Sequence, residues 1–214
     1  MDLTLVPYST YETTLPQEGN YILGQTHGDN IIVYQTFNDA IADYAVANQK
    51  FEGQAYSNSR MTWIKPNFLW MMYRSGWAQK ENQNRILAIE MTFNAFLWLL
   101  KFGVLSSYHP EHGTHDEWKK RLEESDVRIQ WDPDHGIHGQ KLKRRAVQIG
   151  IKGEALKRFH ESIESITDIT GFVNEQYDRS HSAEASLLVV KENVIDVGEN
   201  LRRKYDIPVW TTKS

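Results

Sequence analysis

Residues 31–37 form a run of β-branched and aromatic side chains that passes without a linker into a segment of helical spacing, residues 38–48. The run follows a Gly-Asp-Asn turn signal and is expected to be a buried strand. Asn38 can cap the helix, because its side chain can accept a hydrogen bond from a free N–H group of the first turn. The chain therefore combines strands and helices within a short stretch of sequence.

The other periodic segments continue this mixture. Extended segments are expected at residues 60–64, 85–91, 127–131, 146–151 and 186–190. Helices are expected at residues 66–76, 93–102, 154–163 and 199–205. Strands and helices do not alternate regularly and no long linker divides the chain. We therefore expect an α+β protein, a single domain over residues 1–214, with a mixed or antiparallel central sheet and flanking helices.

Two of the extended segments are expected to pair with each other. Residues 127–131 and 146–151 both alternate apolar and polar side chains, which is typical of an antiparallel pair. The sequence Asp132-Pro133-Asp134 is expected to form a turn that opens a long loop between them. Residues 106–120, which are rich in His and Gly, are expected to be irregular.

Composition excludes several classes of protein. The absence of cysteine removes disulfides, thiolate metal sites and cysteine nucleophiles. A formal net charge of −4 argues against a wholly cationic nucleic-acid coat. The first residues lack a signal-peptide pattern, and the longest apolar patch, residues 95–100, is far shorter than the roughly 20 residues of a membrane span. A cytoplasmic protein without a membrane partner is expected.

The segment over residues 60–77 is the richest in side chains that could bind a ligand. Trp63, Trp70 and Trp77 recur at seven-residue spacing, with Arg60, Lys65 and Arg74 between them. Indole rings beside cations suit a nucleotide, because the rings stack on a base and the cations hold phosphate. The alternative is a core helix whose spacing keeps the three tryptophans on one buried face.

Polar side chains also occur on the two paired segments. Strand alternation places Arg128 and Gln130 on one face, and Asp132 follows as a cation ligand or an acid–base group, or as part of the turn. Arg145 and Gln148 are the polar residues of the second segment. An amide in an apolar run needs hydrogen-bond partners, either a ligand hydroxyl or neighbouring backbone.

Two further groups of residues are interpreted as solvated loops or faces. Histidines cluster in two short polar segments, at positions 109, 112, 115, 135 and 138, but Pro110 and Gly113 interrupt the first group and no closed zinc pattern results. No metal is therefore expected. The basic run over residues 141–145 is either a phosphate-binding edge or a solvated face.

Several of these segments together resemble a known family. Residues 33–35 with the helix after them, 60–77, 127–133 and 145–150 closely resemble domain-of-unknown-function family 4291. The resemblance runs from about residue 22 to about residue 170, and residues 171–214 are more divergent. The family name carries no reaction.

The order of the polar strands also resembles the split sheet of ADP-ribosyltransferases. That layout implies NAD, with Arg60 and Arg74 on phosphate, Trp63 or Tyr73 stacked on a ring, and Gln148 on ribose. Those transferases commonly carry Glu at the last position. Because an amide cannot act as a general base, catalysis would depend on positioning and on stabilisation of an oxocarbenium-like state.

The candidate residues follow from both lines of argument. The catalytic candidates are Gln148, Arg60 and Gln35. The substrate-binding candidates are Trp63, Lys65, Tyr73, Arg74, Trp77, Arg128, Gln130, Asp132 and Arg145. They favour a nucleotide-binding enzyme that carries out ADP-ribosyl transfer or NAD glycohydrolysis. The alternatives are a non-catalytic nucleic-acid or nucleotide binder, and a partner-binding domain in which the tryptophans are interior.

Overall fold

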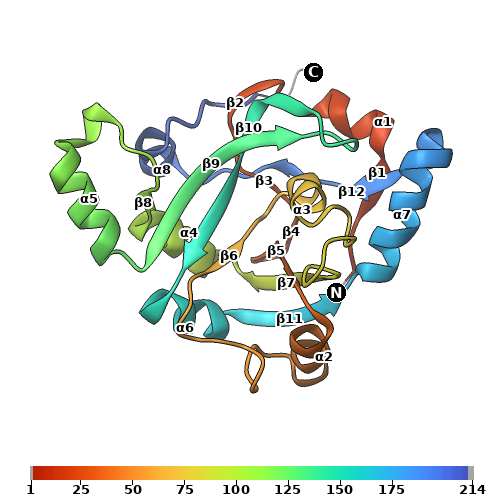
Figure 1. The fold of residues 1–214 in the computed structure, drawn as a ribbon. Coiled ribbons are helices and arrows are strands. Elements are labelled where there is room, and N and C mark those ends of the chain that lie inside the picture. The colour runs from red at the N-terminus through yellow and green to blue at the C-terminus, as the bar shows by residue number, and fades with distance from the viewer. Residues whose placement is uncertain (1, 212–214) are drawn as a thin grey trace.

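Two β-sheets form the frame of the computed structural model (Figure 1), which describes residues 2–211. Met1 and residues 212–214, which the single-domain prediction also covers, lie outside the described residues. The short strand β6 (Thr62–Ile64) connects the sheets. It pairs antiparallel with β10 of the first sheet. Lys65, the next residue, exchanges backbone hydrogen bonds of 2.7 and 3.2 Å with Tyr34 of the second sheet.

The first sheet is mixed. Its strands, in spatial order, are β2 (Glu18–Asn20), β10 (Lys141–Ile151), β9 (Val127–His135) and β8 (Val104–Leu105), and β6 pairs with β10 beside this path. β9 and β10 form the predicted antiparallel pair. At the two edges, β2 pairs in parallel with β10 and β8 pairs in parallel with β9.

The second sheet is antiparallel throughout. Its strands, in spatial order, are β11 (Ile163–Asp168), β7 (Arg85–Thr92), β5 (Asn30–Phe37) and β4 (Thr26–His27). Two small pairs complete the strands: β1 (Leu5–Pro7) with β12 (Leu188–Val190), and β3 (Leu23–Gly24) with β13 (Asn193–Val194).

Helices surround the sheets, and one of them lies near the centre of the view in Figure 1. They are α1 (Tyr8–Tyr11), α2 (Asp39–Asn48), α3 (Phe68–Ser75), α4 (Phe93–Phe102), α5 (His115–Glu124), α6 (Gly153–Glu161), α7 (Thr170–Ser182) and α8 (Glu199–Lys204). The central helix is α3, which packs against β5 and β9 and buries most of its side chains. The predicted α+β class is confirmed. Within residues 2–211 no helix has the length and apolar character needed to cross a membrane.

Local signals fixed the ends of the helices nearest the centre. Asn38 caps α2 by accepting a 3.1 Å hydrogen bond from the N–H of Ile41. Asn67 caps α3 in the same way, through a 2.6 Å bond from the N–H of Trp70. Gly76 ends α3 with a positive φ of 59°, a conformation that glycine adopts without steric cost.

The prediction of an irregular segment over residues 106–120 was wrong, because α5 begins at His115. Thr114 and Glu117 form a reciprocal capping box at its start. None of its side chains with a described exposure is buried, and its apolar residues Trp118 and Leu122 are only half-buried, so the apolar signal of this helix is short. The Thr-x-x-Glu spacing was the signal that could have revealed it.

The predicted turn at Asp132-Pro133-Asp134 was also wrong. These residues belong to β9, which continues to His135, so the connection to β10 is short. Pro133 is paired with Arg145 where the register of the two strands shifts, and a strand tolerates proline at such an irregularity.

The interpretation of three tryptophans on one helical face is wrong as well. Trp63 lies in β6 and Trp70 in α3, while Trp77 follows α3 with a positive φ of 55°. The helix is too short to carry the repeat, because it runs only from its cap at Asn67 to Gly76.

Candidate functional site

A cavity of about 530 Å³ lies where β6 connects the two sheets. Its walls come from β5, from β6 with the residues before it, from α3, from the turn ahead of β7 and from β10. The lining residues are Gln35, Thr36, Phe37, Arg60, Met61, Thr62, Trp63, Lys65, Arg74, Gln83 and Gln148. The volume is in the range of small-molecule sites, which is about 300–1,000 Å³.

Positive charge dominates this cavity. Arg60, Lys65 and Arg74 line it, whereas no aspartate or glutamate among residues 2–211 does. None of the three cations forms an ion pair with the part of the chain that the structure describes. Arg74 donates a 3.2 Å hydrogen bond to the amide oxygen of Gln83. A concave surface with cations of one sign concentrates anions.

Lys65 is the most buried of these cations, with 5% of its surface exposed. Its ammonium nitrogen makes no hydrogen bond to the described residues and lies 5.0 Å from the ring centroid of Trp70, a cation–π contact. Burial, and to a smaller degree the charge of Arg74, lowers the pKa of Lys65 to about 7, while Asp132 acts in the opposite direction. A buried amine without a hydrogen-bonded partner is costly to keep, which is typical of a functional group.

Gln35 lines the same cavity with its amide held in a fixed orientation. Its amide nitrogen donates to the hydroxyl of Thr62 at 2.7 Å and to the backbone carbonyl of Trp63 at 3.2 Å. Its amide oxygen is buried and has no hydrogen-bond partner in the described structure. Because a backbone carbonyl can only accept, the amide is held with its oxygen turned away from β6.

Gln148 is oriented by Asp132 in a similar way. Its amide nitrogen donates to one carboxylate oxygen at 2.7 Å, and that of Gln130 donates to the other at 2.9 Å. An ionised carboxylate accepts and does not donate, so the amide oxygen of Gln148 is the end that faces away from Asp132. Asp132 itself is half-buried and does not line the cavity.

The indole of Trp63 provides a flat surface in the wall. Trp63 is half-buried, and its backbone pairs with Gly150 on β10. A Cβ atom at Gly150 would lie 2.9 Å from Cη2 of the indole and 2.8 Å from the sulfur of Met61. The absence of a side chain at Gly150 thus lets the indole lie against the strand.

The structure brings six of the predicted residues to this cavity: Gln35, Arg60, Trp63, Lys65, Arg74 and Gln148. Other candidates lie elsewhere. Tyr73 is 42% exposed and stacks on His135, with ring centroids 3.4 Å apart. Trp77 is in the core, where its indole N–H donates to the carbonyl of Ile137 at 3.2 Å.

The remaining candidates are on β9 and β10 but do not line this cavity. Arg145 lines a different cavity, of about 320 Å³, together with Trp131. Arg128 and Gln130 alternate with buried Ile129 on β9, and Nε of Arg128 is buried without a partner in the described structure. Among the side chains that the structure describes, no group of three or more His, Asp or Glu is placed to hold a metal ion.

Sequence reasoning missed a buried polar network beside α3. Glu192, which is buried, accepts hydrogen bonds from the backbone N–H of Phe68 at 2.5 Å, from Asn67 at 3.1 Å and from the hydroxyl of Tyr11 at 2.5 Å. These donors fix the start of the helix that carries Arg74. Because the partners are far apart in sequence, no local pattern reveals them.

Arg144 occupies the interior next to this network. It is bound to Asp134 at 2.6 Å and to Glu12 at 2.8 Å. Within the basic run, Arg144 therefore points into the interior. Lys141, Lys143 and Arg145 are exposed.

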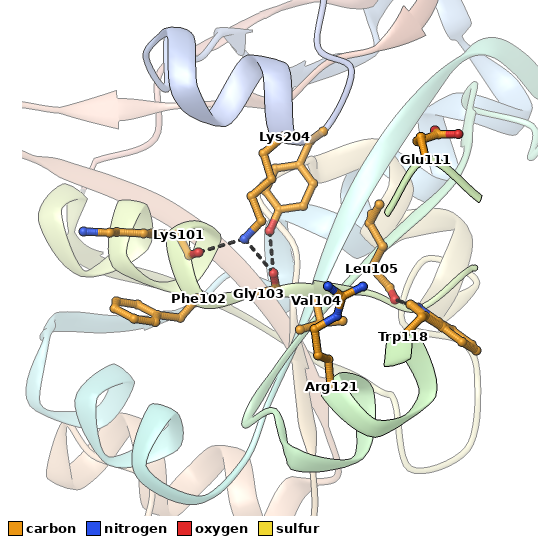
Figure 2. A pocket seen from close by; sticks show the side chains of 10 residues that line it. Lys101, Phe102, Gly103, Val104, Leu105, Glu111, Trp118, Arg121 and Lys204 are labelled. Atoms are coloured by element: carbon orange, nitrogen blue, oxygen red, sulfur yellow. Dashed lines mark hydrogen bonds between the residues drawn. The ribbon is translucent and has the colours of Figure 1, made fainter. Parts of the chain in front are cut away.

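A second cavity, of about 510 Å³, lies beside the end of α4 (Figure 2). Its lysine, Lys204, donates to the backbone carbonyls of Lys101 at 2.7 Å and Gly103 at 2.8 Å. Burial lowers the pKa of Lys204 to about 8. Trp118, also in this wall, donates its indole N–H to the carbonyl of Leu105 at 2.9 Å. These donors satisfy backbone groups, including the free carbonyls at a helix C-terminus, so the cavity offers fewer unpaired groups than the first.

Comparison with protein families assigns the chain. A family model described as domain of unknown function (DUF4291) matches residues 21–195. The chain belongs to this family. The match extends beyond residue 170, where the resemblance was expected to weaken, and it includes Glu192 as well as every residue that lines the first cavity. A search of the curated proteins found no match.

Proposed function

We propose that the cavity at β6 binds a phosphorylated nucleotide, and that this DUF4291 protein is an enzyme of ADP-ribosyl transfer or NAD glycohydrolysis. The observation that carries the proposal is the set of three cations without acidic neighbours in the lining, beside the indole of Trp63. Phosphate supplies the negative charge that these cations lack, and an indole can stack on a planar ring.

Several lining groups have roles in this proposal. Arg60 and Arg74 hold the diphosphate, because guanidinium groups bind phosphate oxygens in pairs. Trp63 stacks on a ring. Tyr73 is not favoured for this role, because it lies outside the lining. The oriented amide oxygen of Gln148 accepts a hydrogen bond from a ribose hydroxyl or from a carboxamide.

The chemistry would depend on electrostatic stabilisation. In both reactions the bond between ribose C1′ and nicotinamide breaks, nicotinamide leaves with the electron pair, and positive charge develops on the ribose. Water or an acceptor group then attacks C1′ and loses a proton. With no carboxylate in the lining among the described residues, the carbonyl dipoles of Gln148 and Gln35 would stabilise the developing charge. The expected cytoplasmic location remains part of this proposal.

Titration calorimetry with NAD and with ADP-ribose tests the proposal. We expect saturable binding by the wild-type protein and a loss of about tenfold or more in Arg60→Ala and Gln148→Ala, because each removes a ligand contact. Arg203→Ala is the matched control, since Arg203 is an exposed arginine on α8. Absence of saturable binding by a folded wild-type protein would show that NAD is the wrong ligand.

A second candidate is a non-catalytic nucleic-acid binder. Lys141, Lys143 and Arg145 are exposed at alternate positions of β10, and none of them forms an ion pair with the described residues. If RNA or DNA binds there, the affinity falls with salt, and replacing Lys143 and Arg145 by Ala reduces the salt slope by about 2. Binding that does not change with ionic strength contradicts this alternative.

A further inference from the structure

The amine of Lys65 differs from the other lysines that the structure describes. Lys65 as a whole is 5% exposed and lines a cavity, and its amine has neither a hydrogen bond nor an ion pair with residues 2–211. By contrast, Lys204 is bound to backbone carbonyls, and Lys80 donates to the carbonyl of Arg74 at 2.7 Å. Lys65 is therefore not occupied by a structural role as a donor.

Its surroundings disfavour the ammonium form. Burial of most of the side chain lowers the pKa of Lys65, and Arg74 adds a like charge from α3, whereas the ring of Trp70, 5.0 Å from the nitrogen, favours the ammonium. Arg60 lines the same cavity, and the charge of Asp132 on β9 acts in the opposite direction and raises the pKa of the amine. An amine that is desolvated beside another cation is activated as a nucleophile, because its lone pair is free at neutral pH.

We infer that Lys65 is a nucleophilic amine that forms an imine with a phosphorylated aldehyde, such as the open-chain form of a sugar phosphate. The phosphate is held by Arg60 and Arg74, and this part of the inference rests on the proposed function. The imine itself depends on Lys65 and on room for a carbonyl carbon next to its nitrogen.

Imine formation at Lys65 needs no reactant other than the aldehyde and releases one water molecule. The nitrogen lone pair of neutral Lys65 attacks the aldehyde carbon, and the C=O π electrons move to oxygen. The nitrogen then loses its two protons to the oxygen by way of solvent. Water leaves and a C=N bond remains. The reaction reverses when water adds to that bond, so the imine is stable only until hydrolysis or reduction.

The pKa of about 7 supports this chemistry. About half of the Lys65 side chains are neutral at pH 7, whereas a lysine with the ordinary pKa of 10.5 is neutral in well under one molecule in a thousand. Imine formation at Lys65 is therefore expected to rise through pH 7 and then level off. At an exposed lysine it would continue to rise toward pH 10.

The experiment uses pyridoxal 5′-phosphate and pyridoxal as probes on the full chain, with borohydride to reduce the imine to a stable secondary amine. Peptide mass spectrometry then measures the label on each lysine. At pH 7 we expect about tenfold more label on Lys65 than on an exposed lysine such as Lys119. Lys65→Arg should lose this label, and Lys119→Arg is the matched control.

The two probes separate the amine from the phosphate site. If both parts of the inference hold, inorganic phosphate and Arg60→Ala reduce labelling by pyridoxal 5′-phosphate and leave labelling by pyridoxal unchanged. Equal labelling of Lys65 and exposed lysines at pH 7, or a profile at Lys65 that rises only near pH 10, overturns the inference.

These outcomes are independent of whether Lys65→Arg folds, because the pH profile is measured on the wild-type protein. Calorimetry with NAD reports on the proposed function separately. Labelling of Lys65 without NAD binding would contradict that function and support the imine. NAD binding without preferential labelling of Lys65 would support the proposed function and contradict the imine.

Discussion

The side-chain amide of Gln148 donates a 2.7 Å hydrogen bond to the carboxylate of Asp132, and this contact determines which end of Gln148 a ligand meets. Asp132 also holds Gln130 at 2.9 Å and raises the pKa of Lys65 against the effect of burial. A residue outside the cavity lining thus affects both an acceptor and an amine in it.

Asp132→Asn should therefore change two properties at once. Asparagine can donate as well as accept, so Gln148 loses its fixed orientation and nucleotide affinity falls by about three- to tenfold. Loss of the negative charge lowers the pKa of Lys65 further, so borohydride-trapped labelling reaches its midpoint at a lower pH. Calorimetry and the labelling profile measure these effects. Asp178→Asn, at an exposed site on α7, is the control, and equal profiles in both variants would contradict the argument.

Gly150→Ala tests the packing of Trp63 against β10. The new methyl group would meet the indole at 2.9 Å and the sulfur of Met61 at 2.8 Å, so the ring has to tilt. We expect a loss of about 1–3 kcal/mol in the free energy of unfolding and weaker nucleotide binding. Urea denaturation and calorimetry check both. Gly171→Ala, where a Cβ meets nothing within 4 Å, should leave binding unchanged.

Much of the cavity could be predicted because several of its residues come from one segment. Arg60, Trp63, Lys65 and Arg74 lie within 15 positions of one another, and their residue types already indicated an anion and a planar ring. The capped ends of α3 were also predictable, since Asn67 and Gly76 act through neighbouring backbone groups.

The rest depended on contacts between distant parts of the chain. Gln35 and Gln148 meet at one cavity only because β6 connects the two sheets. Arg144 and Glu12, and Glu192 and Asn67, are more than a hundred positions apart, so alternation could not say which cation of the basic run turns inward. Pro133 suggested a turn, and the register shift opposite it is what allows β9 to continue.

Lys65→Met should make the protein more stable, with a gain that depends on pH. The pKa of Lys65 is about 7 in the folded protein and is expected near 10.5 in the unfolded chain. The unfolded chain binds the extra proton between these values, so wild-type stability rises with pH from about 7 to 10.5.

Methionine removes this dependence. The free energy of unfolding of Lys65→Met should exceed that of the wild type by up to about 5 kcal/mol below pH 7, and the gain should vanish near pH 10.5. Urea denaturation at pH 6, 8 and 10 measures it. A gain that is the same at all three pH values would mean that Lys65 is not a desolvated amine.

For Glu192 the expected change of stability with pH has the opposite sign, because it is an acid whose pKa is raised. Burial raises the pKa of Glu192 to about 8, against hydrogen bonds from Tyr11 and Phe68 that lower it. The folded protein therefore holds a proton that the unfolded chain releases, between about pH 4.5 and 8. In this range the contribution of Glu192 to stability falls as the pH rises.

Glu192→Gln should cost about 1–3 kcal/mol at pH 5, because the new amide NH₂ cannot accept the hydrogen bond that Asn67 donates. The cost should shrink as the pH approaches 8, since the wild type loses stability and the variant has no acid to titrate at this site. Urea denaturation at pH 5, 6.5 and 8 measures both trends, with Glu161→Gln as an exposed control. If the profiles of the wild type and Glu192→Gln run parallel, Glu192 does not titrate in this range, and α3 is held by a carboxylate that stays ionised throughout.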